Sequence, residues 1–249
     1  EGNVLKAFDI IAEFEALLSL ATLKSNHPNW STPKILDSAH SDRISAMDIN
    51  HPLINKDFAV ANNYEAADHQ LALITGSNMA GKSTFLRTIG INAVLAYAGA
   101  VTCASKFELP IYNLVSYMRI KDSLNESTST FKAELDRMKF ILDQLSTNSD
   151  TFVLIDEMLR GTNSVDKYLG SKAIIRKILA INGKGMVATH DLQLASLEEE
   201  YIGRLKNYHF DIQVKDGEML FDYKLKNGKC TIFNASLLLK GIGVDVQNV

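Results

Sequence analysis

A short apolar run that leads into a glycine-bounded loop is the feature that most constrains this sequence. The run Leu-Ala-Leu-Ile-Thr at residues 71–75 is rich enough in Leu and Ile to form a buried strand, and a loop from Gly76 to Gly81 follows it. Lys82, a Ser and a Thr then open an apolar segment that predicts a helix over residues 83–97. Strand, G-x-x-x-x-G-K-[ST] loop and helix in this order indicate a phosphate-binding loop. A fortuitous glycine-rich turn is the weaker reading, because all three parts agree.

Each residue type in this loop suits phosphate chemistry. Gly76 and Gly81 let the backbone curl so that its N–H groups point at phosphate oxygens. The helix that follows adds partial positive charge at its N-terminus. Lys82 is expected to reach the β- and γ-phosphates, and the Ser83 hydroxyl is expected to hold Mg²⁺. The predicted nucleotide-binding residues of the loop are Gly76, Ser77, Asn78, Met79, Ala80, Gly81, Lys82, Ser83 and Thr84.

The bulk properties are those of an ordinary globular protein. The chain has 249 residues, 46% of them hydrophobic and 22% charged, which allows one large domain with a real core. The net charge of −3 argues against a module that coats nucleic acid. Cys103 and Cys230 lack metal-type spacing, and no apolar run approaches the roughly 18 residues of a membrane span. We therefore expect a reduced, intracellular and cytoplasmic protein with no membrane partner.

The N-terminal part is expected to differ from the rest of the chain. Apolar residues recur at helical spacing over residues 7–21 and predict an amphipathic packing helix that ends before His27. Residues 25–50 are polar and irregular, which predicts a linker and a domain boundary at residue 50. The chain enters the helical pattern almost directly, so we expect it to begin inside a longer protein. Residues 51–249 are expected to form the main domain.

From His51 onward, strands and helices alternate, which predicts an α/β fold with a central, mainly parallel sheet flanked by helices. Strands are predicted at residues 111–118, 151–156 and 186–189, helices at 131–145, 165–181 and 232–239, and a hairpin from 204–212 and 218–225 around Asp216-Gly217. The carboxyl ends of parallel strands converge on ligands in open α/β sheets, so a site is expected at that edge.

Two of these strands end in groups that could complete a nucleotide site. Asp156 is predicted to accept from Ser83 and from water on Mg²⁺, and Glu157 to act as base or to orient the attacking water. His190 follows the strand predicted at residues 186–189, where an imidazole can hydrogen-bond the γ-phosphate or that water. The alternatives are a solvated carboxylate pair and a structural histidine. The predicted catalytic residues are therefore Glu157, His190 and Lys82, with Ser83 and Asp156 as the metal ligands.

Several motifs together resemble the ATPase domain of the MutS family of DNA mismatch-repair proteins. They are residues 75–84, Ser129-Thr-Phe131 with Glu134, residues 156–163 with Asp166, and residues 188–191. The Asn78-Met79 pair inside the loop is far more selective than the general loop pattern. The motifs keep the family's order over residues 51–225 or so, and the N-terminal helix resembles the end of the family's helical lever.

The resemblance implies an ABC-type ATPase that uses ATP and Mg²⁺ and works as a homodimer, with each nucleotide between two subunits. One subunit would supply the phosphate loop, the Asp156-Glu157 pair and His190. The other would supply a signature segment that contains Ser129 and Thr130. Read without the resemblance, Ser129 is a helix N-cap, and both roles can hold.

Further site residues are implied by the same resemblance. Asn163, Ser164 and Asp166 match a loop that crosses the dimer interface, whereas alone they read as a helix N-cap region with Asn163 or Ser164 capping. Phe58 lies near the position where the family places an aromatic that stacks on adenine, out of register by one. The alternative for Phe58 is core packing.

Departures from the family pattern indicate a divergent branch. The family usually has Gly where Leu159 stands and a small hydroxyl residue where Asn163 stands. It usually has Val-Pro-Ala at residues 102–104, and the segment 124–128 lacks the usual glycine. These departures leave ATP hydrolysis supported by the motifs and mismatch recognition open.

The leading interpretation is the Mg²⁺-dependent ATPase domain of a MutS-like DNA mismatch-repair protein. ATP binding would close two subunits, hydrolysis would reopen them, and the helix over residues 7–23 would carry the signal to a DNA clamp outside this chain. The chain lacks a Lys/Arg cluster interleaved with aromatics, so DNA contact is expected elsewhere in the parent protein. The alternatives are an ATPase acting in recombination control or on ribosomes, and an ATP-dependent clamp with little turnover. A transporter-type ATPase fits less well, because a Leu-Ser-Gly-Gly-type signature is absent.

Overall fold

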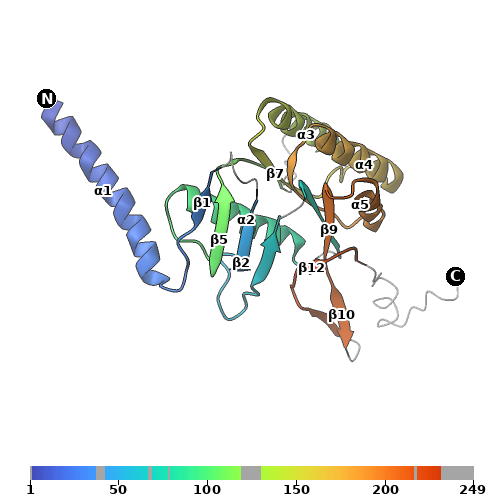
Figure 1. The fold of residues 1–249 in the computed structure, drawn as a ribbon, viewed down its shortest axis with the longest axis horizontal. Coiled ribbons are helices and arrows are strands. Elements are labelled where there is room, and N and C mark those ends of the chain that lie inside the picture. Colours follow the sequence, from blue (N-terminus) through green and yellow to red (C-terminus); the bar gives the residue numbers. More distant parts are fainter. Residues whose placement is uncertain are drawn as a thin grey trace. The chain divides into compact units, whose positions relative to one another are not determined.

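The computed structural model describes residues 2–37, 43–66, 69–77, 79–118, 130–215 and 218–230 (Figure 1). The chain forms two compact units. The first comprises Glu1–Glu65 and Thr88–Ile111, and the second comprises Ala66–Arg87 and Tyr112–Val249. Among the described helices, none combines the length and the apolar character that crossing a membrane requires. The domain boundary at residue 50 stays a prediction.

The first unit contains a long helix and a small sheet. Helix α1 (Gly2–Asn26) confirms the predicted N-terminal helix. Its apolar side chains are exposed, so the predicted packing face finds no partner within the described residues; they include Leu5, Phe8, Ile10, Ile11, Phe14, Leu17 and Leu18. The sheet has the order β1-β5-β2-β3, with β1 (Lys34–Leu36), β2 (Ser45–Ile49), β3 (Asn62–Glu65) and β5 (Lys106–Pro110).

The segment predicted as an irregular linker therefore contains two strands, and that part of the prediction was wrong. Strand β1 pairs with β5 in parallel, and β2 pairs with both β5 and β3 in antiparallel fashion. Strand β1 has 3 residues and β2 has 5, which is too short for a clear alternation of polar and apolar side chains. Their shared partner β5 lies far along the sequence, at Lys106–Pro110, so no local pattern marks them.

The second unit is built on a six-stranded sheet with the order β12-β9-β4-β8-β7-β6. Its strands are β4 (Leu71–Gly76), β6 (Asn113–Tyr117), β7 (Thr151–Asp156), β8 (Lys184–Ala188), β9 (Leu205–Phe210) and β12 (Lys226–Asn227). The neighbouring pairs from β6 to β9 are parallel, and β12 joins β9 in antiparallel fashion. The α/β prediction is confirmed, and the two sheets together are mixed rather than purely parallel.

The register of this sheet brings the strand ends to one level. Ala188 of β8 pairs with Ile74 of β4 on one side and with Asp156 of β7 on the other. Every residue of β4 and of β7 is buried, as expected for strands covered on both faces of a parallel sheet. The predicted phosphate loop and the acidic pair therefore leave the sheet at the same edge.

Helices cover this sheet and complete its core. Helices α3 (Thr130–Thr147) and α4 (Ser164–Ala180) lie side by side and pack on the sheet (Figure 1). The core they share with the strands includes Leu73, Val153, Ile155, Val187, Met138, Ile141, Ile175 and Ile178. The short helices η1 (Leu192–Ser196) and α5 (Leu197–Glu200) follow β8. Helix α2 (Lys82–Tyr97) begins in the second unit and continues into the first.

The predicted hairpin is present, but its first strand was placed wrongly. Residues 205–210 form β9 of the main sheet, because their buried side chains pair alongside β4. The hairpin consists of β10 (Ile212–Lys215) and β11 (Glu218–Phe221), with Lys215 opposite Glu218. Its turn at Asp216-Gly217 and the predicted helix at 232–239 lie outside the described residues.

Candidate functional site

The backbone of the loop after β4 adopts conformations that only some amino acids tolerate. Gly76 has φ +138°, and a Cβ at this position would lie 2.5 Å from the carbonyl oxygen of Phe210. Gly81 has φ +113°, and Met79 has φ +69° with a side chain that is 83% exposed. Asn78 lies outside the described residues. The glycine at the end of β4 is thus required by a close backbone approach as well as by its φ angle.

Lys82 is buried beneath this loop and holds it closed on itself. Its Nζ donates to the carbonyl oxygens of Gly76 and Ser77, each at 2.7 Å. Burial lowers the pKa of Lys82 to about 8, and the Asp156 carboxylate opposes that shift. An ammonium held here faces the inside of the loop, which is the position a phosphate-binding lysine needs.

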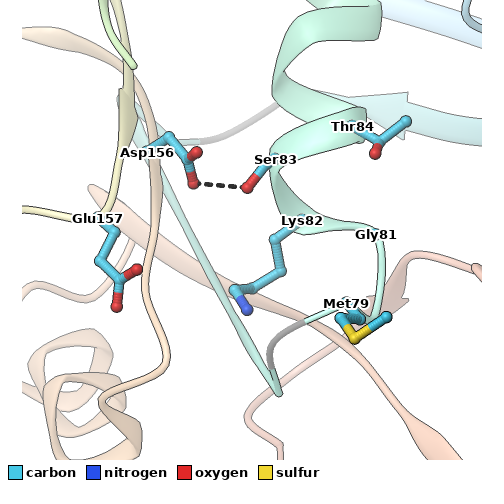
Figure 2. A pocket seen from close by; sticks show the side chains of 7 residues that line it. All are labelled: Met79, Gly81, Lys82, Ser83, Thr84, Asp156 and Glu157. Atoms are coloured by element: carbon cyan, nitrogen blue, oxygen red, sulfur yellow. Dashed lines mark hydrogen bonds between the residues drawn. The ribbon is translucent and has the colours of Figure 1, made fainter. Parts of the chain in front are cut away.

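The Ser83 hydroxyl and the Asp156 carboxylate meet directly. Ser83 Oγ donates to Asp156 Oδ1 at 2.8 Å, as the dashed line in Figure 2 shows. Asp156 is buried at the end of β7. A cavity of about 110 Å³ opens beside the pair, and it is lined by Met79, Gly81, Lys82, Ser83, Thr84, Asp156 and Glu157 (Figure 2).

This donor set fits magnesium when a nucleotide is also present. A hydroxyl and a carboxylate are hard oxygen ligands, and Mg²⁺ is usually bound by one or two protein groups together with phosphate oxygens and water. Among the described residues, no group of three or more His, Cys, Asp and Glu side chains could hold a metal. A cation at Ser83 and Asp156 would therefore depend on the bound phosphates.

Glu157 turns away from the strand in an unusual backbone conformation. Its φ is +62°, and its N–H donates to the Ala188 carbonyl at 2.9 Å. Lys167 Nζ donates to its Oε1 at 3.1 Å. Arg160 Nε lies 3.2 Å from its Oε2 as an ion pair, without the angle of a hydrogen bond. His190 Nδ1 is also paired with Glu157 Oε1. Three basic side chains thus surround one carboxylate.

His190 follows β8 and reaches the same carboxylate. Burial lowers its pKa, with a further contribution from the charge of Lys82. Its Nε2 lies 3.4 Å from Lys167 Nζ. An ammonium only donates, so Nε2 is assigned as the acceptor and Nδ1 as the protonated nitrogen that faces Glu157. The imidazole is therefore a neutral ring in one tautomer.

The loop after Glu157 rests on helix α3. Glu134 is buried, and its Oε2 accepts from the Gly161 N–H at 3.4 Å. A Cβ at Gly161 would lie 3.2 Å from the Cβ of Phe131 at the start of α3. Burial raises the pKa of Tyr117, and the Glu134 carboxylate adds to that shift. The motif residue Glu134 therefore connects the acidic strand end to the beginning of α3.

The segment predicted to cross an interface forms the N-cap of α4. Asn163 Oδ1 accepts from the backbone N–H groups of Val165 at 3.1 Å and Asp166 at 2.9 Å. Asn163 Nδ2 donates to Asp166 Oδ2 at 2.6 Å. The capping interpretation is confirmed for Asn163 rather than Ser164, and the interface role stays a prediction.

The structure says less about the three remaining predicted site residues, Ser129, Thr130 and Phe58. Ser129 lies outside the described residues, and Thr130 begins α3 with a side chain that is not described. Phe58 belongs to the first unit and is 79% exposed, so core packing is wrong for it. Its stacking on adenine stays a prediction.

Sequence reasoning missed Lys167 and gave Arg160 no role. Lys167 stands near the start of α4, where the helix dipole favours acidic side chains over cations. A lysine in that position is the one local signal that could have pointed to a partner carboxylate.

Comparison with known proteins identifies the family to which this chain belongs. The sequence model of the family MutS domain V matches residues 72–237. The chain belongs to the MutS family. The DNA mismatch repair protein MutS of Thermus thermophilus is 32% identical over 253 residues, which cover 100% of this chain and 29% of that protein. The predicted family is thereby confirmed.

Two further relatives carry the same name. MutS of Methanosarcina mazei is 34% identical over 229 residues, or 88% of this chain and 24% of that protein. MutS of Bacillus licheniformis is 32% identical over 227 residues, or 88% of this chain and 25% of that protein. The chain therefore spans less than a third of the length of these relatives.

Proposed function

We propose that this chain is the ATP-binding and ATP-hydrolysing domain of a MutS-like DNA mismatch-repair protein. The observation that carries the proposal is the Ser83–Asp156 hydrogen bond beside a phosphate loop whose lysine is buried. Glu157 and His190 leave neighbouring strands at the same edge of the sheet. Loop, metal ligands and a base therefore share one site, which is what phosphoryl transfer to water requires.

Phosphate binding would use the loop and the start of α2. The N–H groups of the loop and the N-terminus of the helix point donors at an anion. Lys82 would exchange its bonds to Gly76 and Ser77 for bonds to phosphate oxygens, regaining two acceptors for the two it gives up. Ser83 and Asp156 would hold Mg²⁺, which neutralises charge on the β- and γ-phosphates when bound.

Hydrolysis would use Glu157 as the group that orients water and takes its proton. A carboxylate has about four lone-pair positions, so its contacts with Lys167 and Arg160 leave room for a water. His190 holds the same carboxylate through Nδ1 and lies beside it at the end of β8. The two side chains would thus bring a base and an orienting imidazole to the strand edge.

We infer further that two copies of the chain close around ATP and that DNA is bound elsewhere in the parent protein. The partner's signature residues would be Ser129 and Thr130, and the interface loop Asn163 to Asp166. The exposed side chains of Val165 (65%) and Leu169 (55%) at the start of α4 support an apolar contact there. Helix α1, with its exposed apolar side chains, would carry the motion outward.

Two substitutions test the enzymatic proposal. Lys82→Ala is expected to abolish ATP binding, and Glu157→Gln is expected to bind ATP while losing hydrolysis. The measurements are nucleotide binding by equilibrium titration and phosphate release, with Lys106→Ala in the first unit as the surface control. Full hydrolysis by purified Glu157→Gln would contradict the role of Glu157.

One observation favours a second candidate, an ATP-dependent clamp with little turnover. Both oxygens of Glu157 already face cationic side chains in this structure. A carboxylate stabilised in this way is a weaker base. ATP-dependent dimerisation in sedimentation experiments, without phosphate release above background, would support the clamp over the ATPase.

A further inference from the structure

Lys167 joins the two side chains that the proposed reaction uses at the strand edge. Its Nζ donates to Glu157 Oε1 at 3.1 Å and lies 3.4 Å from His190 Nε2. Glu157 and His190 follow different strands, and Lys167 stands on a third element, helix α4. The ammonium is therefore the point at which α4 contacts both groups.

The surroundings of Lys167 are unlike those of a solvated surface lysine. Its side chain is only 15% exposed. Burial lowers its pKa, and the positive charge of Arg160 lowers it further. Placing a cation in such a position costs free energy, which a fixed arrangement of acceptors must offset. Its Nζ contacts two acceptors, the Glu157 carboxylate and the His190 ring.

The contacts of Lys167 also determine the state of His190. Because an ammonium can only donate, it fixes Nε2 as the acceptor and leaves the proton on Nδ1, next to Glu157 Oε1. Without the ammonium, the ring could exchange its tautomer or rotate. Among the described side chains, Glu157 would then keep one cationic partner, Arg160, on its other carboxylate oxygen.

We propose that Lys167 is a positioning residue that holds Glu157 and His190 in the arrangement needed for ATP hydrolysis. The inference rests on the proposed ATPase function and adds a residue to it. Lys167 acts through Glu157 and His190, and it is not among the residues that line the cavity beside Ser83 and Asp156. Its removal should therefore slow the chemical step and leave nucleotide binding intact.

The test compares three variants of the chain in one ATPase assay. Lys167→Met keeps the length of the side chain without its charge and should lower kcat by about tenfold to a hundredfold, with the Kd for ATP unchanged. Lys167→Arg keeps a cationic donor and should retain most of the activity. Lys172→Met is the matched control on the same helix, because Lys172 pairs with Glu200. Thermal unfolding of each variant checks that the fold is kept.

The same assay separates a positioning role from a binding role, because kcat and the Kd for ATP are measured independently. An unchanged kcat in Lys167→Met, or a weaker Kd for ATP with kcat unchanged, would overturn the positioning role. Absence of hydrolysis by the unmodified chain would instead defeat the proposed function, so the two failures are distinguishable.

Discussion

Ser83 Oγ donates a hydrogen bond of 2.8 Å to Asp156 Oδ1, and this bond joins the start of α2 to the end of β7. The hydroxyl has its oxygen free to bind a cation while its proton is held by the carboxylate. The second carboxylate oxygen lies 3.8 Å from Arg160 Nη2, and its remaining lone pair can accept from water on a metal. In the proposed function, this hydrogen bond would link phosphate binding to magnesium binding.

Asp156→Asn is expected to separate these two functions. The amide oxygen can still accept from Ser83, but the negative charge that attracts Mg²⁺ is lost. ATP binding without magnesium should remain close to that of the unmodified chain, and the strengthening by magnesium should fall by about tenfold to a hundredfold. Nucleotide titrations with and without magnesium measure this, with the exposed Asp150→Asn as control. An Asp156→Asn chain with unchanged magnesium dependence would contradict the assignment.

ATP binding should weaken as the pH rises above the pKa of Lys82, which burial lowers to about 8 in the free chain. Bound phosphate adds negative charge beside the ammonium and raises its pKa in the complex. Above pH 8, the complex therefore binds more protons than the free chain, so linkage makes binding weaker at higher pH. Below that pH, both states are protonated and this contribution is constant.

The measurement is the Kd for ATP between neutral and alkaline pH, with magnesium omitted so that only groups of the chain and nucleotide titrate. The expected slope is at most about tenfold per pH unit above the pKa of Lys82. Lys82→Arg stays charged throughout and should show a flat profile. A wild-type profile without a slope, or an equal slope in Lys82→Arg, would show that Lys82 is not the responsible group.

The loop and the ends of the strands could be predicted from the sequence, because each is marked by a local pattern of residues. Glycine spacing, a lysine and an apolar run identify the phosphate loop, and two further apolar runs end at Asp156 and before His190. The parallel pairing of β4, β8 and β7 then brings them to one edge. The family resemblance was predictable for the same reason.

The contacts around Glu157 were not predictable from such patterns. They depend on the positive φ angles of Glu157 and Leu159, which turn the chain back so that Lys167 reaches the carboxylate. Neither residue type signals that conformation. The position of β9 was missed for a related reason, since its partner β4 lies more than 100 residues earlier in the sequence.

Leu159 and Gly170 are expected to be energetically coupled. Leu159 is buried with φ +54°, and a Cβ at Gly170 would lie 2.4 Å from its Cδ1. Gly170→Ala should lower the free energy of unfolding by about 1–3 kcal/mol through overpacking, despite the better helix propensity of Ala. Urea unfolding measures this. In a Leu159→Ala background the same change should cost less, and an equal cost in both backgrounds would exclude the contact.

Asn163 should contribute to stability as the N-cap of α4. Asn163→Ala removes the acceptor for the N–H groups of Val165 and Asp166, and should lower the free energy of unfolding by about 1 kcal/mol. Asn163→Ser restores an N-cap hydroxyl, so most of that loss should be recovered. Urea unfolding of the three proteins gives the comparison. Equal stability of the Ala and Ser variants would mean that the side chain of Asn163 does not stabilise the helix, and would leave the dimer interface as its remaining role.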